Sequence, residues 1–214
     1  MKKPQFEPER RTIDFTLERR GDKDSRTIRG YAAVFDSKSK NLGWFREKID
    51  RNAFEDSDMT DVVAVLNHDF NILFARSSSK TLSLGVDDKG LYYEFDAPNT
   101  TTGNDLLEMV SRGDINKSSF QFIVSRDLWE QDDEDGEIRT ILAVKRVIDV
   151  SPVTFAAYPD TSVAKRSHDA FVEEGQEEGQ EEEEEEQEEQ EERKVPADVQ
   201  YAEAELELMR IKNH

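Results

Sequence analysis

Residues 118–148 read SSFQFIVSRDLWEQDDEDGEIRTILAVKRVI, and they reveal more about the fold class than any other stretch of the chain. Phe120, Phe122 and Val124 alternate with other residues, which is the period of a β-strand with one buried face. A polar loop at 132–137 contains Asp-Gly, a turn signal, and an apolar run at 139–148 follows it. We therefore predict two antiparallel strands joined by this loop.

Shorter strand patterns surround this hairpin. A DDKG turn at 87–90 joins two of them. One helix is predicted, capped by Asn104, carrying Leu106, Leu107 and Val110 on its apolar positions, and ending near Gly113. Many short strands with one or two helices indicate an α+β domain that is mainly β, built as a compact barrel or a sandwich. The other strand patterns lie at 13–17, 27–35, 44–49, 62–67, 81–86, 91–96 and 153–157.

Composition excludes several classes of function. The 214 residues suit one domain with tails, or two small domains. A net charge of −20 argues against binding nucleic acid through its phosphates. The chain has no cysteine, hence no disulfide, thiolate metal site or cysteine nucleophile. With no apolar run long enough to span a membrane and no secretory signal, we expect a soluble protein that acts inside a cell.

Much of the charge is concentrated near the C-terminal end. Residues 173–192 contain 14 of the 49 acidic residues and no basic one. Such a tract repels itself and buries no apolar surface. We therefore predict an N-terminal tail at 1–11, a folded domain at 12–165, a disordered Glu-rich linker at 166–195 and an amphipathic helix at 196–214. The linker and helix either dock on a partner or only keep the chain soluble.

Three histidines limit the search for an acid–base catalyst. His214 is the last residue, and His168 lies among polar residues, so we expect both to be solvated. His68 follows the apolar run 62–66, and a base at a strand end can be held rigidly against a cleft. A lone histidine at a strand end is, however, often only structural.

Ser118 and Ser119 begin the strand at 118–125. Because strand ends meet at one rim of a barrel, His68 and Ser119 could come within hydrogen-bond reach. Asp149 lies in the apolar setting VIDVSPV and could orient the imidazole, as in a catalytic triad. No cofactor and no metal is predicted: one useful histidine among dispersed carboxylates is a poor transition-metal set, and the acidic loop at 132–137 lacks the calcium-binding EF-hand spacing.

Four ordered segments together are similar to a known family. They contain FREKIDRNAF, NHD, RGDINKSSF and DVSPVTFAAYP. In this order and spacing the chain resembles the prohead serine proteases of tailed bacteriophages of the HK97 type, from about Ile28 to Thr161. That family is distantly related to the herpesvirus assemblins, which implies an assemblin-like β-barrel flanked by helices.

The resemblance implies a capsid maturation protease. Such an enzyme works inside the viral procapsid in the host cytoplasm, processes scaffold or major capsid protein, and cleaves itself. By the family motif, His68 is the general base and Ser119 the nucleophile, while Asp149 occupies the acidic position of the third member. Partners would be these substrates and further copies of the chain, with no nucleic acid and no membrane.

The sequence departs from the family at the nucleophile motif. Relatives usually have Met-Ser-Phe-Gly-Phe where this chain has Ser118-Ser119-Phe120-Gln121-Phe122. Ser118 therefore stays an alternative, although Ser119 is favoured because it points away from the face shared by Phe120 and Phe122. A protease-like domain that acts as an assembly scaffold or chaperone is the alternative function.

Overall fold

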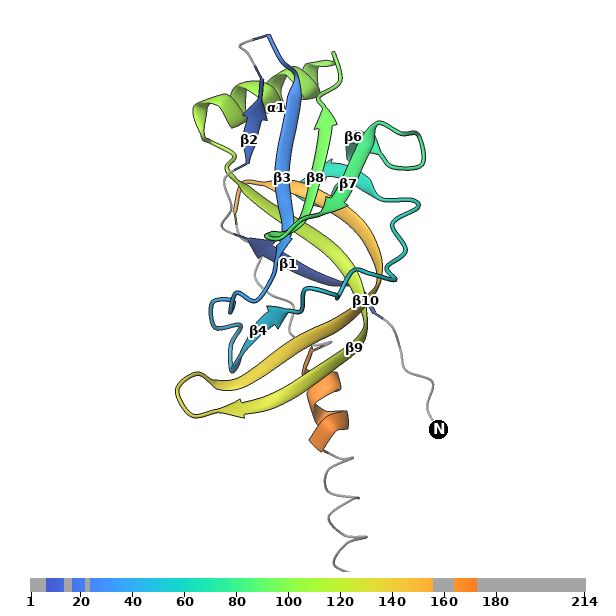
Figure 1. The fold of residues 1–214 in the computed structure, drawn as a ribbon. Helices are drawn as coiled ribbons and strands as arrows, with labels where there is room; N and C mark the ends of the chain where they lie inside the picture. Colours follow the sequence, from blue (N-terminus) through green and yellow to red (C-terminus); the bar gives the residue numbers. More distant parts are fainter. Residues whose placement is uncertain (1–6, 14–16, 22–23, 156–163, 173–214) are drawn as a thin grey trace, which may run out of the picture. The chain divides into compact units, whose positions relative to one another are not determined.

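The computed structural model describes residues 7–13, 17–21, 24–155 and 164–172 (Figure 1). The chain divides into two units, residues 1–165 and 166–214. All named strands and the one named helix lie in the first unit. The Glu-rich tract and the predicted C-terminal helix at 196–214 lie outside the described residues, so both remain predictions, as do the domain limits.

The described strands of the first unit form two sheets. In the larger sheet the strands run in the order β1-β9-β10-β5-β6, and β4 also pairs with β10. Its strands are β1 (Glu9–Ile13), β4 (Phe45–Ile49), β5 (Val63–Leu66), β6 (Asp69–Arg76), β9 (Lys117–Asp132) and β10 (Gly136–Val153). The smaller sheet has the order β2-β3-β8-β7. Its strands are β2 (Glu18–Arg20), β3 (Thr27–Val34), β7 (Leu82–Val86) and β8 (Gly90–Asp96).

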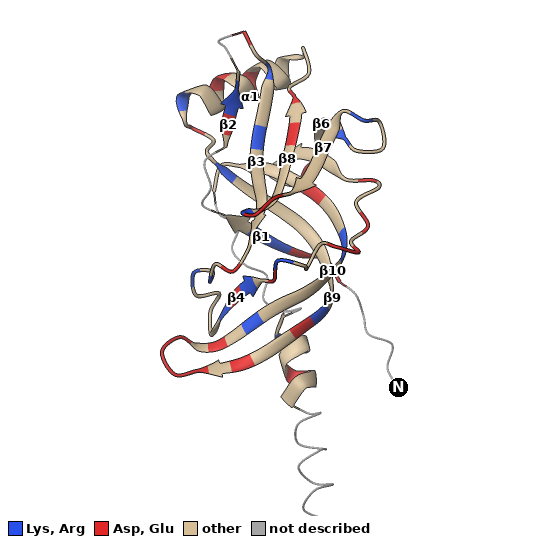
Figure 2. Cartoon of the chain, viewed as in Figure 1, with Lys and Arg blue, Asp and Glu red and all other residues tan. Residues whose placement is uncertain are grey.

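The predicted hairpin is present as β9 and β10, and both strands are longer than expected. The acidic loop closes the hairpin, and its aspartate and glutamate residues colour the ribbon red at this turn in Figure 2. Interruptions of the register between Ile141 and Asp149 bend the pair. The first half of β10 pairs with β4 and its second half with β5, both in parallel. This hairpin is therefore the frame that carries the other strands of its sheet.

The predicted class, α+β and mainly β, is confirmed, and the predicted barrel needs one correction. Among the described residues the two sheets stay separate, and no continuous hydrogen-bonded path joins them into a barrel. The sheets instead share a core, because apolar residues from both enter one cluster that includes Ile28, Tyr93, Phe120 and Phe122. The apolar faces of the two sheets are buried against each other, so the alternating hydrophobic pattern is satisfied without a closed barrel.

Helix α1 (Thr101–Arg112) has the predicted apolar face but a different cap. Thr100 is the N-cap, and its side chain accepts a hydrogen bond from the Gly103 amide. Asn104, predicted as the cap, lies inside the helix, where its side-chain oxygen accepts a hydrogen bond from Arg26. Gly113 ends the helix in the left-handed conformation (φ 82°), as expected for a C-terminal glycine.

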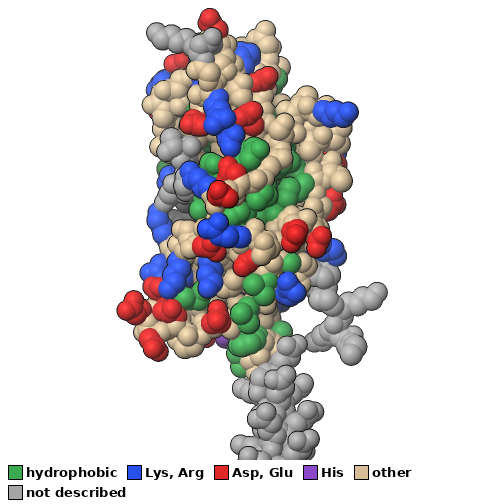
Figure 3. Space-filling view, in the orientation of Figure 1, with side chains coloured by type: hydrophobic (Ala, Val, Ile, Leu, Met, Phe, Trp, Pro, Cys, Tyr) green, Lys and Arg blue, Asp and Glu red, His purple; other side chains and the backbone are tan. Residues whose placement is uncertain are grey.

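Both ends of the domain contain more structure than expected. Strand β1 begins at Glu9, inside the predicted tail at 1–11, and it pairs with β9 over its whole length. Residues 166–172, placed in the disordered linker, belong to a helix at 164–172. No described helix is long and apolar enough to cross a membrane. On one face of the molecule, charged side chains of both signs surround patches of apolar ones (Figure 3).

Candidate active site

The two serines at the start of β9 face opposite sides of the sheet. Ser118 points into the core, where its hydroxyl lies 2.9 Å from the Tyr93 hydroxyl. A Cβ atom on Gly30 would come within 2.7 Å of the Ser118 oxygen, so no space remains for a substrate there. Burial raises the pKa of Tyr93, which keeps this phenol neutral. Ser119 lies on the other face of the strand.

His68 lies in the two-residue turn between β5 and β6. Asn67 and His68 both have positive φ, 51° and 60°, which is the signature of a type I′ turn. The left-handed conformation costs free energy for histidine. Hydrogen bonds of Asn67 with Pro152 and Thr154 compensate for this cost and hold the turn against the end of β10. The Asn67 amide donates to Pro152 O (3.0 Å), and its side-chain oxygen accepts from the Thr154 amide (2.9 Å). The imidazole is thus held in one place.

Asp149 comes from β10, which lies between β9, the strand of Ser119, and β5, the strand that leads into the His68 turn. It is directly opposite Gln121 of β9 and Val63 of β5 in the sheet register. Ser151, two residues later on the same face, donates a hydrogen bond to Asp149 Oδ1 (2.7 Å). The Ser151 hydroxyl also accepts from the His68 amide (3.3 Å). Ser151 therefore connects the carboxylate to the histidine turn.

The structure brings the three predicted residues together in one chain of contacts. His68 Nε2 lies 2.7 Å from Ser119 Oγ, and His68 Nδ1 lies 2.7 Å from Asp149 Oδ1. Ser119 and Asp149 are fully buried, and His68 is 8% exposed. An imidazole placed between a hydroxyl and a carboxylate can take the hydroxyl proton on one nitrogen while the carboxylate stabilises the resulting cation.

Two further groups at this site were not predicted. Ser151 could have been inferred, because residues two apart on a strand share a face and Asp149 had already been selected. The other group is the main-chain carbonyl of Arg11, which accepts a hydrogen bond from Ser119 Oγ (2.9 Å). No local signal indicates this contact, because it joins residues 108 positions apart in the sequence.

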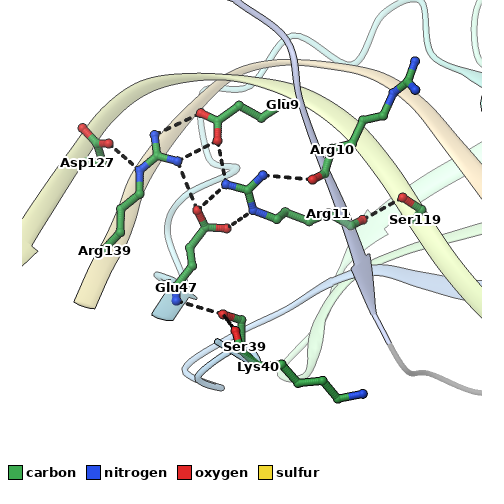
Figure 4. Close-up of polar contacts among 9 residues, drawn as sticks. All are labelled: Glu9, Arg10, Arg11, Ser39, Lys40, Glu47, Ser119, Asp127 and Arg139. Carbon is green, nitrogen blue, oxygen red and sulfur yellow. Dashed lines mark hydrogen bonds and ion pairs between the residues drawn. The ribbon is translucent and has the colours of Figure 1, made fainter. Parts of the chain in front are cut away.

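A buried group of charges surrounds the side chain of Arg11 (Figure 4). Arg11 donates hydrogen bonds to both carboxylate oxygens of Glu47 and to Glu9, and each of the three donor–acceptor distances is 2.7 Å. Arg139 donates to Glu9, Glu47 and Asp127. We call these five residues the ion cluster. Burial acts to lower the pKa of both arginines, but the Glu47 and Glu9 carboxylates outweigh it, and the pKa of each is raised.

A cleft of about 1350 Å³ opens beside the histidine. His68 and Phe120 contribute to its walls, as do the residues of β1 from Arg10 to Ile13, whereas Ser119 does not line it. No group of three or more histidine, cysteine or acidic side chains suited to a metal ion occurs in the part of the chain that the structure describes.

Residues 14–174 match the sequence profile of the caudovirus prohead serine proteases. The chain belongs to this family. The matched range contains His68, Ser119 and Asp149, and it begins directly after the last residue of β1. Membership of the prohead serine protease family makes the chain a capsid maturation protease in the broad sense.

One solved structure is similar to this prohead protease chain, the capsid assembly protease of bacteriophage T4, gp21. The similarity has a TM-score of 0.41 and 10% sequence identity, and it covers 67% of this chain and 98% of that one. No curated protein sequence matches the chain.

Proposed function

We propose that the chain is a serine endopeptidase in which Ser119 is the nucleophile, His68 the general base and Asp149 the residue that orients and stabilises the imidazole. The observation that carries this proposal is the contact of His68 Nε2 with Ser119 Oγ, combined with the contact of Nδ1 with Asp149. A serine hydroxyl is a weak nucleophile until a base within hydrogen-bond reach removes its proton. The two 2.7 Å contacts meet that requirement.

Catalysis would proceed by acyl transfer. As Ser119 Oγ bonds to the substrate carbonyl carbon, its proton passes to His68 Nε2. The imidazolium then gives this proton to the leaving amine, the carbon–nitrogen bond breaks, and an ester to Ser119 remains. Water attacks the ester with His68 again as base, which releases the acid and restores the hydroxyl.

The proposed substrates rest on the family of the chain. We propose that they are the major capsid protein, the scaffolding protein or both, and the protease itself, cut inside the procapsid in the host cytoplasm. Ser118 is not favoured as nucleophile, because its hydroxyl contacts Tyr93 in the core. A role as an assembly scaffold with little turnover is the alternative that the test below addresses.

The test is co-expression of the chain with its own capsid and scaffold proteins, followed by intact-mass analysis. Wild type is compared with Ser119→Ala and with Ser118→Ala as the matched control. Shortened capsid or scaffold chains with wild type and Ser118→Ala, but not with Ser119→Ala, are expected. Processing that survives Ser119→Ala contradicts the assignment. Particles that assemble with no processing in any sample favour the scaffold role.

A further inference from the structure

Strand β1 covers the proposed nucleophile. It runs antiparallel along β9 with Thr12 opposite Ser119 and Arg11 opposite Phe120. Ser119 has no exposed surface. Because β1 is the edge strand of its sheet, β9 would become the edge if β1 were absent. A substrate therefore cannot reach the hydroxyl while β1 keeps this position.

The contact with β1 also opposes activation of the serine. A carbonyl oxygen only accepts hydrogen bonds, so Ser119 donates its single hydroxyl hydrogen to Arg11 O. That hydrogen is then not directed at His68 Nε2. The hydroxyl then offers no hydrogen to Nε2, although Nε2 and Oγ lie 2.7 Å apart. The residues are assembled, but the proton is misplaced.

The ion cluster fixes β1 in this position. Glu9 and Arg11 belong to β1, while Glu47, Asp127 and Arg139 come from β4, β9 and β10 (Figure 4). Glu9 and Arg11 are 1% and 6% exposed. Charges paired in a buried setting interact strongly, and removing one partner leaves the others uncompensated. The cluster is therefore a specific fastening for β1, which itself precedes the residues that match the family.

We infer that β1 occupies the position of the substrate strand, and that an extended segment of the substrate polypeptide binds by replacing β1 on the edge of β9. Pairing of a peptide with an exposed sheet edge is a common mode of recognition, in which main-chain hydrogen bonds supply the affinity. The cleft beside His68 is lined by Arg10–Ile13, so departure of β1 would join this cleft to Ser119. The inference rests on the proposed function, since it assigns a regulation to the same site.

A reversible crosslink tests this inference, because the chain has no cysteine of its own. Arg10 and Gln121 are directly opposite each other in the β1–β9 register. Cα atoms of such pairs lie about 4.5–5.5 Å apart, within the range of a disulfide. The double substitution Arg10→Cys with Gln121→Cys should therefore lock β1 in place when oxidised and free it when reduced. The matched control is Ser83→Cys with Glu94→Cys, an opposed pair on β7 and β8.

The readout is labelling of Ser119 by a fluorophosphonate, measured by intact mass and peptide mapping. In this reaction the serine oxygen bonds to phosphorus, fluoride leaves, and His68 takes the proton. We expect labelling of the oxidised Arg10/Gln121 protein to be at least about tenfold slower than that of the same protein after reduction. Oxidation should not change labelling of the Ser83/Glu94 control. Equal labelling of both redox forms of the locked protein would overturn the inference.

The complementary test weakens the ion cluster that holds β1 in place. Arg11→Met removes the cation that joins β1 to Glu47, whereas Asp127→Asn weakens the ion cluster away from β1. Labelling of Arg11→Met should be about tenfold faster than that of wild type and of Asp127→Asn, with folding checked by tryptophan fluorescence. If Arg11→Met and the reduced protein both resist labelling while capsid chains are cut in co-expression, the inference fails and the proposed function stands. If no capsid chain is cut either, the proposed function fails.

Discussion

Asp149→Asn should remove activity without a matching loss of stability. The substitution keeps the shape of the side chain and replaces a fully buried carboxylate by a neutral amide. Asp149 Oδ1 accepts from Ser151 and contacts His68, but Oδ2 has no hydrogen-bond partner among the described residues. A buried charge with an unsatisfied oxygen is costly, so the Asp149 carboxylate lowers the stability of the folded domain.

The expected changes in stability and in activity follow from these contacts. Loss of the charge on the acceptor side of the His68 contact costs about 1 kcal/mol, the difference between a charge-assisted and a neutral hydrogen bond. The unpaired position stays polar in the variant, but it no longer carries a buried charge, which returns about 1–3 kcal/mol. The free energy of unfolding should therefore change by no more than about 1 kcal/mol on the destabilising side. Activity should fall about 10²–10⁴-fold, because the imidazole loses its orienting and stabilising partner.

The assay pairs urea unfolding, followed by tryptophan fluorescence, with the rate of capsid-chain cleavage on co-expression. Asp127→Asn is the matched control, because it makes the same chemical change on a carboxylate that pairs with Arg139 in the ion cluster. That variant should lose about 1.5–3 kcal/mol of stability and keep its cleavage rate. If Asp149→Asn unfolds far more easily than wild type, or retains full activity, the reasoning about this carboxylate is refuted.

Ser118→Ala should keep activity and lose about 1–3 kcal/mol of stability, because the Tyr93 hydroxyl is left buried without its partner; an inactive but stable variant in urea unfolding would contradict this. Ser151→Ala should lower the cleavage rate by about tenfold, less than Asp149→Asn, because it removes one hydrogen bond to the carboxylate and leaves His68 in contact; a loss as large as that of Ser119→Ala would argue against this ranking. Deletion of residues 171–214 should reduce the amount of protease packaged into procapsids, measured by quantitative mass spectrometry, if the acidic tract docks by charge. Unchanged packaging would leave the tract with a role in solubility only.

The sequence predicted the parts of the fold that depend on local patterns. The alternation of Phe120, Phe122 and Val124 indicated β9, the turn at 132–137 indicated its partner, and the apolar spacing before Gly113 indicated α1. The cap of α1 was predicted wrongly, because threonine and asparagine are both good capping residues. In the structure Thr100 is the cap, and the Asn104 side chain accepts a hydrogen bond from Arg26 instead. The unclosed arrangement of the two sheets depends on long-range packing, which strand patterns do not encode.

The chemistry of the side chains and the family motif were enough to propose the residues of the candidate site. Its place after an apolar run, together with the family motif, selected His68 among the three histidines, and the face of the strand favoured Ser119 over Ser118. The arrangement around Arg11 was not predictable. Its side chain belongs to a stretch that reads as a polar tail, and only the pairing of β1 with β9 brings Glu9 and Arg11 to Glu47 and Arg139. Buried charges of this kind look like solvated ones in sequence.

The central claim is that Ser119 is a nucleophile activated by His68, and the most direct measurement is adduct mapping in procapsids. Assembling particles are treated with a fluorophosphonate, and the tryptic peptide of residues 118–126, which contains both candidate serines, is fragmented. The account predicts an adduct on Ser119 in wild type and none in His68→Gln. An adduct on Ser118, or cleavage of capsid chains with no adduct on this peptide, would contradict it.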